Sequence, residues 1–413
     1  MNPSLLFSII IAILVTDFLF ELWLDFINYR HHSTHIPDEL KGIYDEEQYS
    51  RQQEYKKANT RFGLISGIFG FLVMMIFILA SGIPWADGII RSITTHPVLM
   101  ALLFFGSLML VSDILSIPFA VYQTFVIEER FGFNKTTPLT FVLDKLKGWL
   151  LGAIIGGGLL SLIIWIYMKT PQMLWIYAWI AISIFSVLMT LVYSSIIVPL
   201  FNKQTPLEAG ELRDSILQFV NKAGFKLKNI FVIDGSKRST KANAYFTGIG
   251  PEKRIVLYDT LINDLEKTEI VAVLAHETGH YKKKHIWINL ITGILQTGII
   301  LLLFSVFIGS PELSAAFGVE EHSFHIGMIA FGILFSPISF VLGIFLNLWS
   351  RKAEYQADRF AKNYGFGKEL INSLKKLTQK NLGNLTPHPL YVFFHYSHPT
   401  LLQRIRAINN NEG

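Results

Sequence analysis

The sequence contains no cysteine among its 413 residues. This absence excludes disulfide bonds, thiolate metal ligands and a cysteine nucleophile, and the chain needs no oxidising compartment in order to fold. Charged residues are also scarce, at 16% of the chain, whereas hydrophobic residues make up 51%. A soluble protein of this length is seldom so apolar, so the composition favours a membrane protein.

The charge that is present is slightly basic, with a net value of +5. In a membrane protein such an excess is typical of basic loops, because Lys and Arg are retained on the cytosolic side. No basic strand or groove interleaved with aromatic residues accompanies this charge. We therefore expect a lipid bilayer, and no nucleic acid, among the partners.

Long apolar stretches predict seven membrane-spanning helices, because about 20 apolar residues cross the hydrocarbon core. The first stretch has no basic segment before it and carries Asp17, Glu21 and Asp25, so it is interpreted as a retained helix and not as a cleaved signal peptide. Carboxylates are costly in lipid, so these three should face water or protein, or lie on an interfacial helix. The seven stretches lie at 4–26, 62–82, 98–121, 148–168, 174–199, 286–308 and 325–350.

Lys and Arg are unevenly distributed among the loops that join these stretches. The positive-inside rule places the basic loops in the cytosol and the N-terminus outside. The tail carries no KDEL-type retrieval signal, so we expect a multi-pass protein of the endoplasmic reticulum membrane or of a bacterial inner membrane. The poorly basic loops are 83–97, 168–173 and 309–324, and the basic regions are 27–61, 122–147, 200–285 and the segment after 350.

One short motif carries recognisable chemistry, since His276, Glu277 and His280 stand in the order H-E-x-x-H. On a helix, residues four apart project from one face, so both imidazoles can bind the same tetrahedral metal ion. Neutral imidazole suits zinc, and zinc with an open position acidifies its bound water and polarises a carbonyl group. Glu277 would then be a general base; the alternative is two ordinary histidines. Thr268 is the expected N-cap of this helix, which should continue into the sixth span.

Two histidines need a third ligand, which without cysteine must be a histidine or a carboxylate. Glu354 and Asp358 lie four residues apart on one expected helical face, just after the seventh apolar stretch. Taken alone, they would be surface acids paired with Arg351 or Lys362. Beside the H-E-x-x-H motif, Glu354 would complete a zinc site, and Asp358 would hydrogen-bond the free ring nitrogen of a ligand histidine.

The chain is expected to divide into four regions. Within the second region a helical pattern over 212–223 precedes three runs of strand length, so the predicted fold is mainly helical with a small β-sheet. The regions are 1–199 with the first five spans and loops 27–61 and 122–147, 200–285 as a cytosolic metallopeptidase region, 286–350 with the last two spans, and 351–413 as a cytosolic helical region. The strand-length runs are 229–234, 244–247 and 254–258.

The sequence resembles the type I CAAX prenyl proteases, which are integral membrane zinc metallopeptidases with seven spans. The resemblance covers nearly the whole chain and rests on the blocks at 125–134, 243–246, 255–260, 276–280, 354–358 and 396–404. It implies that His276, His280 and Glu354 bind one zinc ion per chain and that Glu277 is the catalytic base. It also implies that the seven helices enclose a large intramembrane chamber with the site at its cytosolic end.

The resemblance extends to residues outside the metal motif. Asn243 and Ala244 match a strand whose backbone holds a peptide in extended form, and the alternative is a plain edge strand. His398 and Arg404 match a C-terminal motif in which the histidine helps to stabilise the oxyanion and the arginine organises the site. The alternative is a loop histidine and a surface arginine. The implied reaction removes the last three residues from a substrate prenylated at a C-terminal Cys.

Other functions stay open on the sequence alone. A quality-control membrane zinc protease would act on non-prenylated substrates, although seven spans and the 396–404 block count against it. A site-2 intramembrane protease places its metal inside a span and uses an Asp ligand. A transporter with a relic metal site could use Asp17, Glu21, Asp113 and Asp144 along a pathway. A complete set of base, three ligands and a supporting Asp favours an enzyme.

Overall fold

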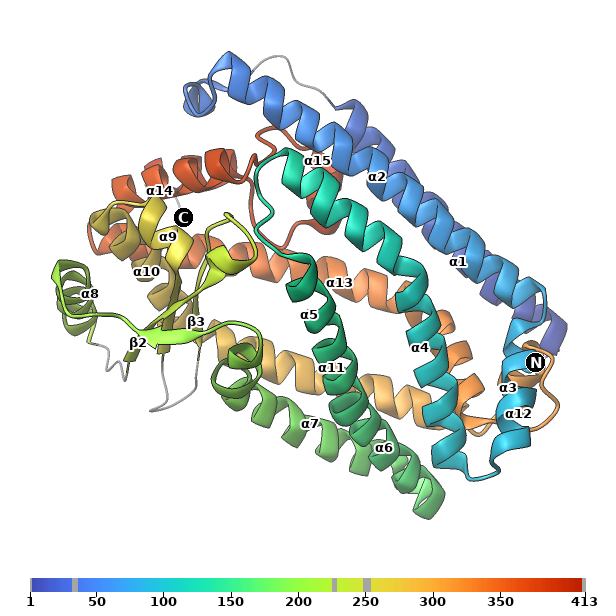
Figure 1. Ribbon diagram of the computed structural model, residues 1–413. Helices are drawn as coiled ribbons and strands as arrows, with labels where there is room; N and C mark the ends of the chain where they lie inside the picture. Colours follow the sequence, from blue (N-terminus) through green and yellow to red (C-terminus); the bar gives the residue numbers. More distant parts are fainter. Residues whose placement is uncertain (1, 32–35, 225–228, 248–253, 411–413) are drawn as a thin grey trace.

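The computed structural model describes residues 2–31, 36–224, 229–247 and 254–410 (Figure 1). Most of this chain is helical. The helices are α1 (Pro3–Arg30), α2 (Glu46–Leu79), α3 (Gly82–Ile93), α4 (Pro97–Tyr122), α5 (Pro138–Leu151), α6 (Gly157–Lys169), α7 (Leu174–Val192), α8 (Glu211–Lys222), α9 (Asp259–Asp264), α10 (Lys267–Lys282), α11 (His285–Phe307), α12 (Pro311–Ala316), α13 (Phe324–Asn363), α14 (Gly367–Lys380), α15 (Pro389–His395) and α16 (Leu401–Asn409). The strands are β1 (Gln204–Pro206), β2 (Asn229–Ile233), β3 (Ala244–Thr247) and β4 (Arg254–Tyr258).

Within the described residues, 7 helical segments are long and apolar enough to cross a membrane, and each overlaps one predicted stretch. Several extend beyond the apolar stretch into polar sequence. For example, α2 begins at Glu46, where the Asp45 side chain caps it by accepting from the Gln48 backbone N–H at 2.7 Å. The segments are Pro3–Arg30, Glu46–Leu79, Pro97–Glu128, Pro138–Lys169, Pro171–Leu200, His285–Phe307 and Phe324–Asn363. The third segment ends in a π-helix at Gln123–Glu128.

Carboxylates within these segments have polar partners on neighbouring elements. On α1, Asp17 accepts from the Ser336 hydroxyl at 2.9 Å, and Glu21 lies 3.2 Å from the His395 imidazole. These contacts join α1 to α13 and α15. Of the three acids on α1, Asp17 and Glu21 therefore contact neighbouring helices. The prediction that these acids face protein or water agrees with the contacts of Asp17 and Glu21, although both side chains are exposed.

The other two intramembrane acids also form ion pairs. Asp113 on α4 accepts from Lys145 on α5 at 2.6 Å. Asp144 accepts two hydrogen bonds from the Arg238 guanidinium, at 2.8 and 2.9 Å, which ties α5 to the loop between β2 and β3. Paired in this way, both acids have a structural role between elements.

The four strands form one mixed sheet at one end of the molecule (Figure 1). Their order is β1-β2-β4-β3, with β2 and β4 parallel and the outer pairs antiparallel. The three predicted strands are all present, whereas β1 was not predicted. It is three residues long and ends in Pro206, so its own sequence has no strand pattern, and only pairing with β2 makes it extended. The fold class, mainly helical with seven spans and a small sheet, is confirmed.

The hydrophobic core beside the sheet positions α10. Ile255 and Leu257 of β4 are fully buried against Ile216 of α8 and against Ile270 and Leu274 of α10. Burying an aliphatic side chain of this size stabilises the fold by about 1.5–3 kcal/mol. The strand therefore holds the buried face of α10 in one orientation and turns its histidine-bearing face away from the sheet.

Two expectations about α10 were wrong. Its N-cap is Glu266 and not Thr268, because the Glu266 side chain accepts from the backbone of Glu269 while the Glu269 carboxylate accepts from the Glu266 N–H at 2.9 Å. The helix also does not continue into the sixth span. Lys284 adopts a left-handed conformation with φ 61°, which ends α10 and lets α11 start at His285 in a new direction.

Candidate active site

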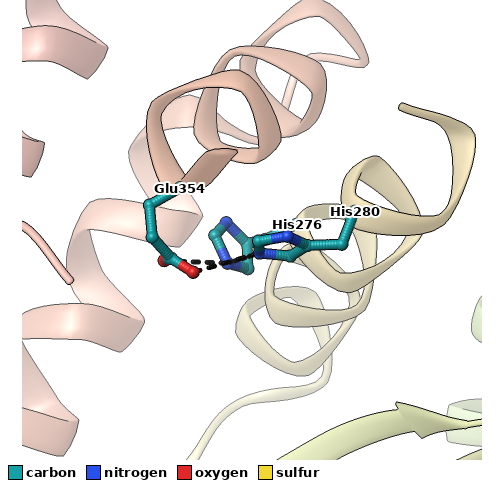
Figure 2. A group of neighbouring side chains, drawn as sticks. All are labelled: His276, His280 and Glu354. Carbon is teal, nitrogen blue, oxygen red and sulfur yellow. Dashed lines mark hydrogen bonds and ion pairs between the residues drawn. The ribbon is translucent and has the colours of Figure 1, made fainter. Parts of the chain in front are cut away.

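The site is built where α10 packs against α13 (Figure 2). Gly279 lies at the contact, and a Cβ atom there would be 2.9 Å from the Ala357 Cα atom. Real Cβ atoms do not approach backbone so closely, so only glycine permits this helix spacing. Ala357 is flanked by Glu354 and Asp358, and Gly279 by His276 and His280. The close approach therefore brings the two predicted halves of the site together.

The nitrogen and oxygen atoms of His276, His280 and Glu354 point at one another (Figure 2). The two Nε2 atoms are 3.2 Å apart, and the Glu354 oxygens lie 3.2 Å from His280 Nε2 and 3.4 Å from His276 Nε2. Tetrahedral zinc with bonds of about 2.0–2.1 Å has ligand atoms about 3.3–3.4 Å apart. These separations match the edges of such a tetrahedron.

The chemistry of the donor set fits a cation as well. Glu354 is buried, and its Oε2 atom has no hydrogen-bond partner in the described part of the chain. Arg404 Nη1 lies 3.5 Å from this oxygen but does not hydrogen-bond it, so the buried carboxylate can still bind a metal ion there. Among the described residues, His276, His280 and Glu354 form the cluster of His and acidic side chains that could hold a metal ion. Their candidate ligand atoms lie within 4.8 Å of one another.

Asp358 and Arg404 fix the orientation of the first histidine. Asp358 Oδ1 lies 2.8 Å from His276 Nδ1, and the Asp358 carboxylate accepts two hydrogen bonds from Arg404, at 2.9 and 2.5 Å. The predicted role of Asp358 requires Nδ1 to carry the proton, because a carboxylate can only accept. His276 Nε2 is then free to bind a metal. The alternative pairing of Asp358 with Arg351 or Lys362 is wrong.

The electrostatic balance around His276 favours positive charge. Burial and the nearby Arg404 lower the pKa of this imidazole, but hydrogen bonds with Asp358 and Glu354 outweigh them and raise it to about 9. The pKa of the Arg404 guanidinium is lowered by burial and raised more strongly by Asp358, Glu354 and Glu277, so the group remains charged. The carboxylates that favour a proton on this imidazole also favour a metal cation, which binds the neutral form and would displace that proton.

His285 supports the second histidine and was missed from the sequence. It is buried, its Nδ1 lies 3.0 Å from His280 Nδ1, and its Nε2 lies 2.9 Å from Gln356 Oε1. Because an amide oxygen only accepts, His285 carries its proton on Nε2 and accepts at Nδ1. His280 then donates from Nδ1, which leaves its Nε2 free for a metal. No spacing rule relates a histidine to another five residues earlier, so this contact could not be predicted from the sequence.

The C-terminal loop reaches the same centre. His398 Nε2 lies 3.3 Å from Glu354 Oε1, although the His398 side chain is 64% exposed. Arg351 holds the start of this loop, since its guanidinium donates to the backbone oxygens of Val392 at 3.3 Å and of Tyr396. The structure thus places His398 and Arg404 beside the candidate metal ligands, and Arg351 holds the loop through its backbone oxygens.

The predicted peptide-binding strand forms the edge of the sheet and contacts α10. Asn243 precedes β3, and its side-chain oxygen accepts from the Ala244 N–H at 2.9 Å. Just before it, Lys241 donates to Glu128 at 2.8 Å and to the Tyr55 hydroxyl at 2.9 Å. This Lys241 clamp, formed by Lys241, Glu128 and Tyr55, ties the edge strand to the membrane helices.

Comparison with known proteins agrees with this geometry. A family model described as "CAAX prenyl protease N-terminal, five membrane helices" matches residues 25–203, and that of "Peptidase family M48" matches residues 206–412. The chain belongs to the CAAX prenyl protease family. CAAX prenyl protease 1 of Saccharomyces cerevisiae is 35% identical, with 99% of this chain and 96% of that protein aligned. The Homo sapiens CAAX prenyl protease 1 homolog is 32% identical, with 96% and 94% aligned.

A solved structure supports the same membership. The crystal structure of S. mikatae Ste24p matches with a TM-score of 0.92 and 36% sequence identity, and the match covers 99% of each chain. The resemblance drawn from the sequence blocks is confirmed. This CAAX prenyl protease family member is therefore a multi-pass membrane metallopeptidase that acts on protein or peptide substrates, and its family implies a bound metal ion.

Proposed function

We propose that this protein is a zinc metalloendopeptidase that removes the C-terminal tripeptide from proteins ending in Cys-a-a-X with a prenylated Cys. The supporting observation is the tetrahedral spacing of His276, His280 and Glu354 donor atoms. The chain is similar over nearly its whole length to proteins named CAAX prenyl protease 1. Seven apolar helices suit a substrate that carries an isoprenoid chain.

The catalytic side of the membrane follows from the charges of the loops. The loops on the side of α10 are rich in Lys and Arg, and such loops are retained in the cytosol. The site would therefore face the cytosol, where prenylated proteins are made. An intramembrane chamber above the site, as the family resemblance implies, would accommodate the isoprenoid.

In the proposed mechanism, His276 and His280 would hold zinc through their Nε2 atoms and Glu354 through its carboxylate. When bound, zinc supplies Lewis-acid polarisation of the scissile carbonyl and lowers the pKa of water. Glu277 directly follows His276 on α10 and is half-buried. Its carboxylate would take a proton from the attacking water and return it to the leaving amine.

Two further groups would position the substrate and the developing charge. The free edge of β3 would accept the peptide as an added strand. The Asn243 side chain caps the Ala244 N–H, so it would have to turn away when a substrate carbonyl takes that hydrogen bond. His398 is exposed and close to Glu354, so its imidazole can donate a hydrogen bond toward an oxyanion formed there.

The test is cleavage of a farnesylated Cys-a-a-X peptide by the detergent-purified protein, with and without a chelator. We expect release of the tripeptide that stops on chelation and recovers on adding zinc. Glu277→Gln should abolish turnover while bound zinc is retained, because the variant keeps all three ligands. Glu320→Gln, an exposed residue on a distant loop, is the matched control and should behave like the wild type.

Three results would contradict parts of the proposal. Glu277→Gln activity above a few per cent of wild type would show that another group is the base. Zinc-dependent cleavage of the non-prenylated peptide at an equal rate would move the function toward general membrane proteolysis. A purified protein that binds no zinc would remove the metal assignment itself.

A further inference from the structure

A groove of about 520 Å³ lies between α2 and the end of α4, away from the metal centre. Its wall is apolar and partly aromatic. From α2 it includes Phe62 and Ile65, and from the other side it includes Phe119 and Val126. Ile65 is 63% exposed and Val126 45% exposed, so the groove is open along its length. Neither the catalytic residues nor the edge strand line it.

The groove crosses the border of the spanning region. On α2, no charged residue follows Arg61 until Asp87. On the facing segment, no charge lies between Asp113 and Glu128. Arg61 therefore marks the level at which the helix enters hydrocarbon, and the apolar wall lies below that level.

Two arginines line the groove at this border. Arg61 and Arg130 come from opposite sides of it, and both are exposed. Arg61 has no ion-pair partner in the described part of the chain. Arg130 contacts Glu54 at 3.1 Å, but their side chains are 66% and 56% exposed, and such a pair is worth little. Arg130 can therefore exchange this partner for another anion. The end of the groove at the membrane border keeps a net positive charge.

We propose that this groove binds an anionic glycerophospholipid. Arg61 and Arg130 would hold the headgroup phosphate and its second anionic group, because guanidinium groups match planar oxyanions and a basic pocket at the membrane border attracts such lipids. One acyl chain would lie along Ile65, Phe119 and Val126. A free inorganic anion would leave this apolar wall uncovered. An isoprenoid alone would leave Arg61 without an anion and Arg130 with only its exposed Glu54 partner.

The test uses the full-length protein in detergent, titrated with phosphatidylserine or phosphatidylcholine of identical acyl chains, with bound lipid counted by native mass spectrometry. We expect wild-type protein to prefer phosphatidylserine. The double variant Arg61→Gln/Arg130→Gln should lose roughly tenfold to thirtyfold of that affinity, at about one factor of five per arginine, and keep its affinity for phosphatidylcholine. Ile65→Trp fills the groove and should lower the affinity for both lipids.

Arg30→Gln is the matched control, because Arg30 is an exposed arginine at the end of α1, at the same membrane border. It should leave both affinities unchanged. Three results would overturn the proposal: no preference for phosphatidylserine in wild type, equal retention by the double variant, or an equal loss in Arg30→Gln. Zinc content and melting temperature show whether each variant is folded, and Ile65→Trp decides the question if the double variant is not.

Discussion

The contact between Gly279 and Ala357 predicts the effect of a single methyl group on the metal centre. Replacing Gly279 by Ala would place a Cβ atom 2.9 Å from the Ala357 Cα atom and 3.0 Å from the Phe360 Cβ atom. Carbon atoms pack best at about 3.5–4.0 Å, so the two helices would have to separate by roughly 0.6–1 Å. The backbone of α13 cannot turn aside as a flexible side chain would.

This separation acts directly on the proposed ligands, because two lie on α10 and the third on α13. Glu354 is 3.2 Å from His280 and 3.4 Å from His276, and metal–ligand distances tolerate only about ±0.2 Å. We expect Gly279→Ala to weaken zinc binding by at least 10- to 100-fold, or roughly 1.4–2.8 kcal/mol. The overpacked contact should also destabilise the fold by about 1–3 kcal/mol.

Competition with a chelator measures the zinc affinity, and thermal unfolding measures the stability. Gly293→Ala is the matched control: Gly293 lies within α11, and a Cβ atom there meets nothing within 4 Å. It should leave zinc affinity unchanged and stabilise the helix slightly, because alanine favours helix over glycine. A Gly279→Ala protein that binds zinc as tightly as wild type would refute the argument that this glycine sets the ligand spacing.

Three further predictions concern the residues around the centre. His285→Leu removes the acceptor for His280 Nδ1, so zinc affinity should fall about 10- to 100-fold in chelator competition, and an unchanged affinity would contradict the tautomer assignment. Asp358→Asn removes the carboxylate that accepts two hydrogen bonds from the buried Arg404 guanidinium, while Glu354 remains 3.5 Å from it. Chemical denaturation should therefore show a loss of about 3 kcal/mol, the lower end of the range for a broken buried pair, and a loss below 1 kcal/mol would be inconsistent with that pairing. Burial lowers the pKa of Lys241, but Glu128 and Tyr55 raise it more strongly, above its usual 10.5. The Lys241 clamp therefore contributes its full free energy of folding below pH 10.5, and this contribution is lost as the pH rises through the higher pKa of the folded state. The stability difference between wild type and Lys241→Gln should therefore shrink only above that pH.

Local patterns account for the parts of the fold that the sequence predicted correctly. Apolar length alone identified the seven spans, and the four-residue spacing of His276 and His280 placed both on one helix face. The pairing of Glu354 with them needed the chemical argument that zinc takes a third ligand. These features depend on periodicity and chemistry within short segments, which a single sequence contains.

The missed features depend on contacts between distant segments or on one backbone angle. β1 is extended only because β2 lies beside it. Lys284 adopts a left-handed conformation that was not predicted, and it turns the chain so that His285 faces His280. The wrong prediction of a continuous helix and the missed role of His285 therefore have the same cause. Arg351 has neighbouring acids in the sequence, yet its partners are backbone oxygens of α15 and of the residue after it, which no charge pattern predicts.

The length of α13 has a mechanical consequence. One unbroken helix of 40 residues begins beside a buried polar contact, in which His325 lies 2.7 Å from Asp87, and it carries Glu354 near its other end. From Phe324 to Glu354 the helix measures about 45 Å, so a tilt of one degree about its far end would displace the carboxylate by roughly 0.8 Å. That displacement is as large as the one expected from Gly279→Ala. The proposed catalytic geometry near one end of α13 thus depends on contacts at its other end, and substitutions at Asp87 would tilt the helix and displace the Glu354 carboxylate.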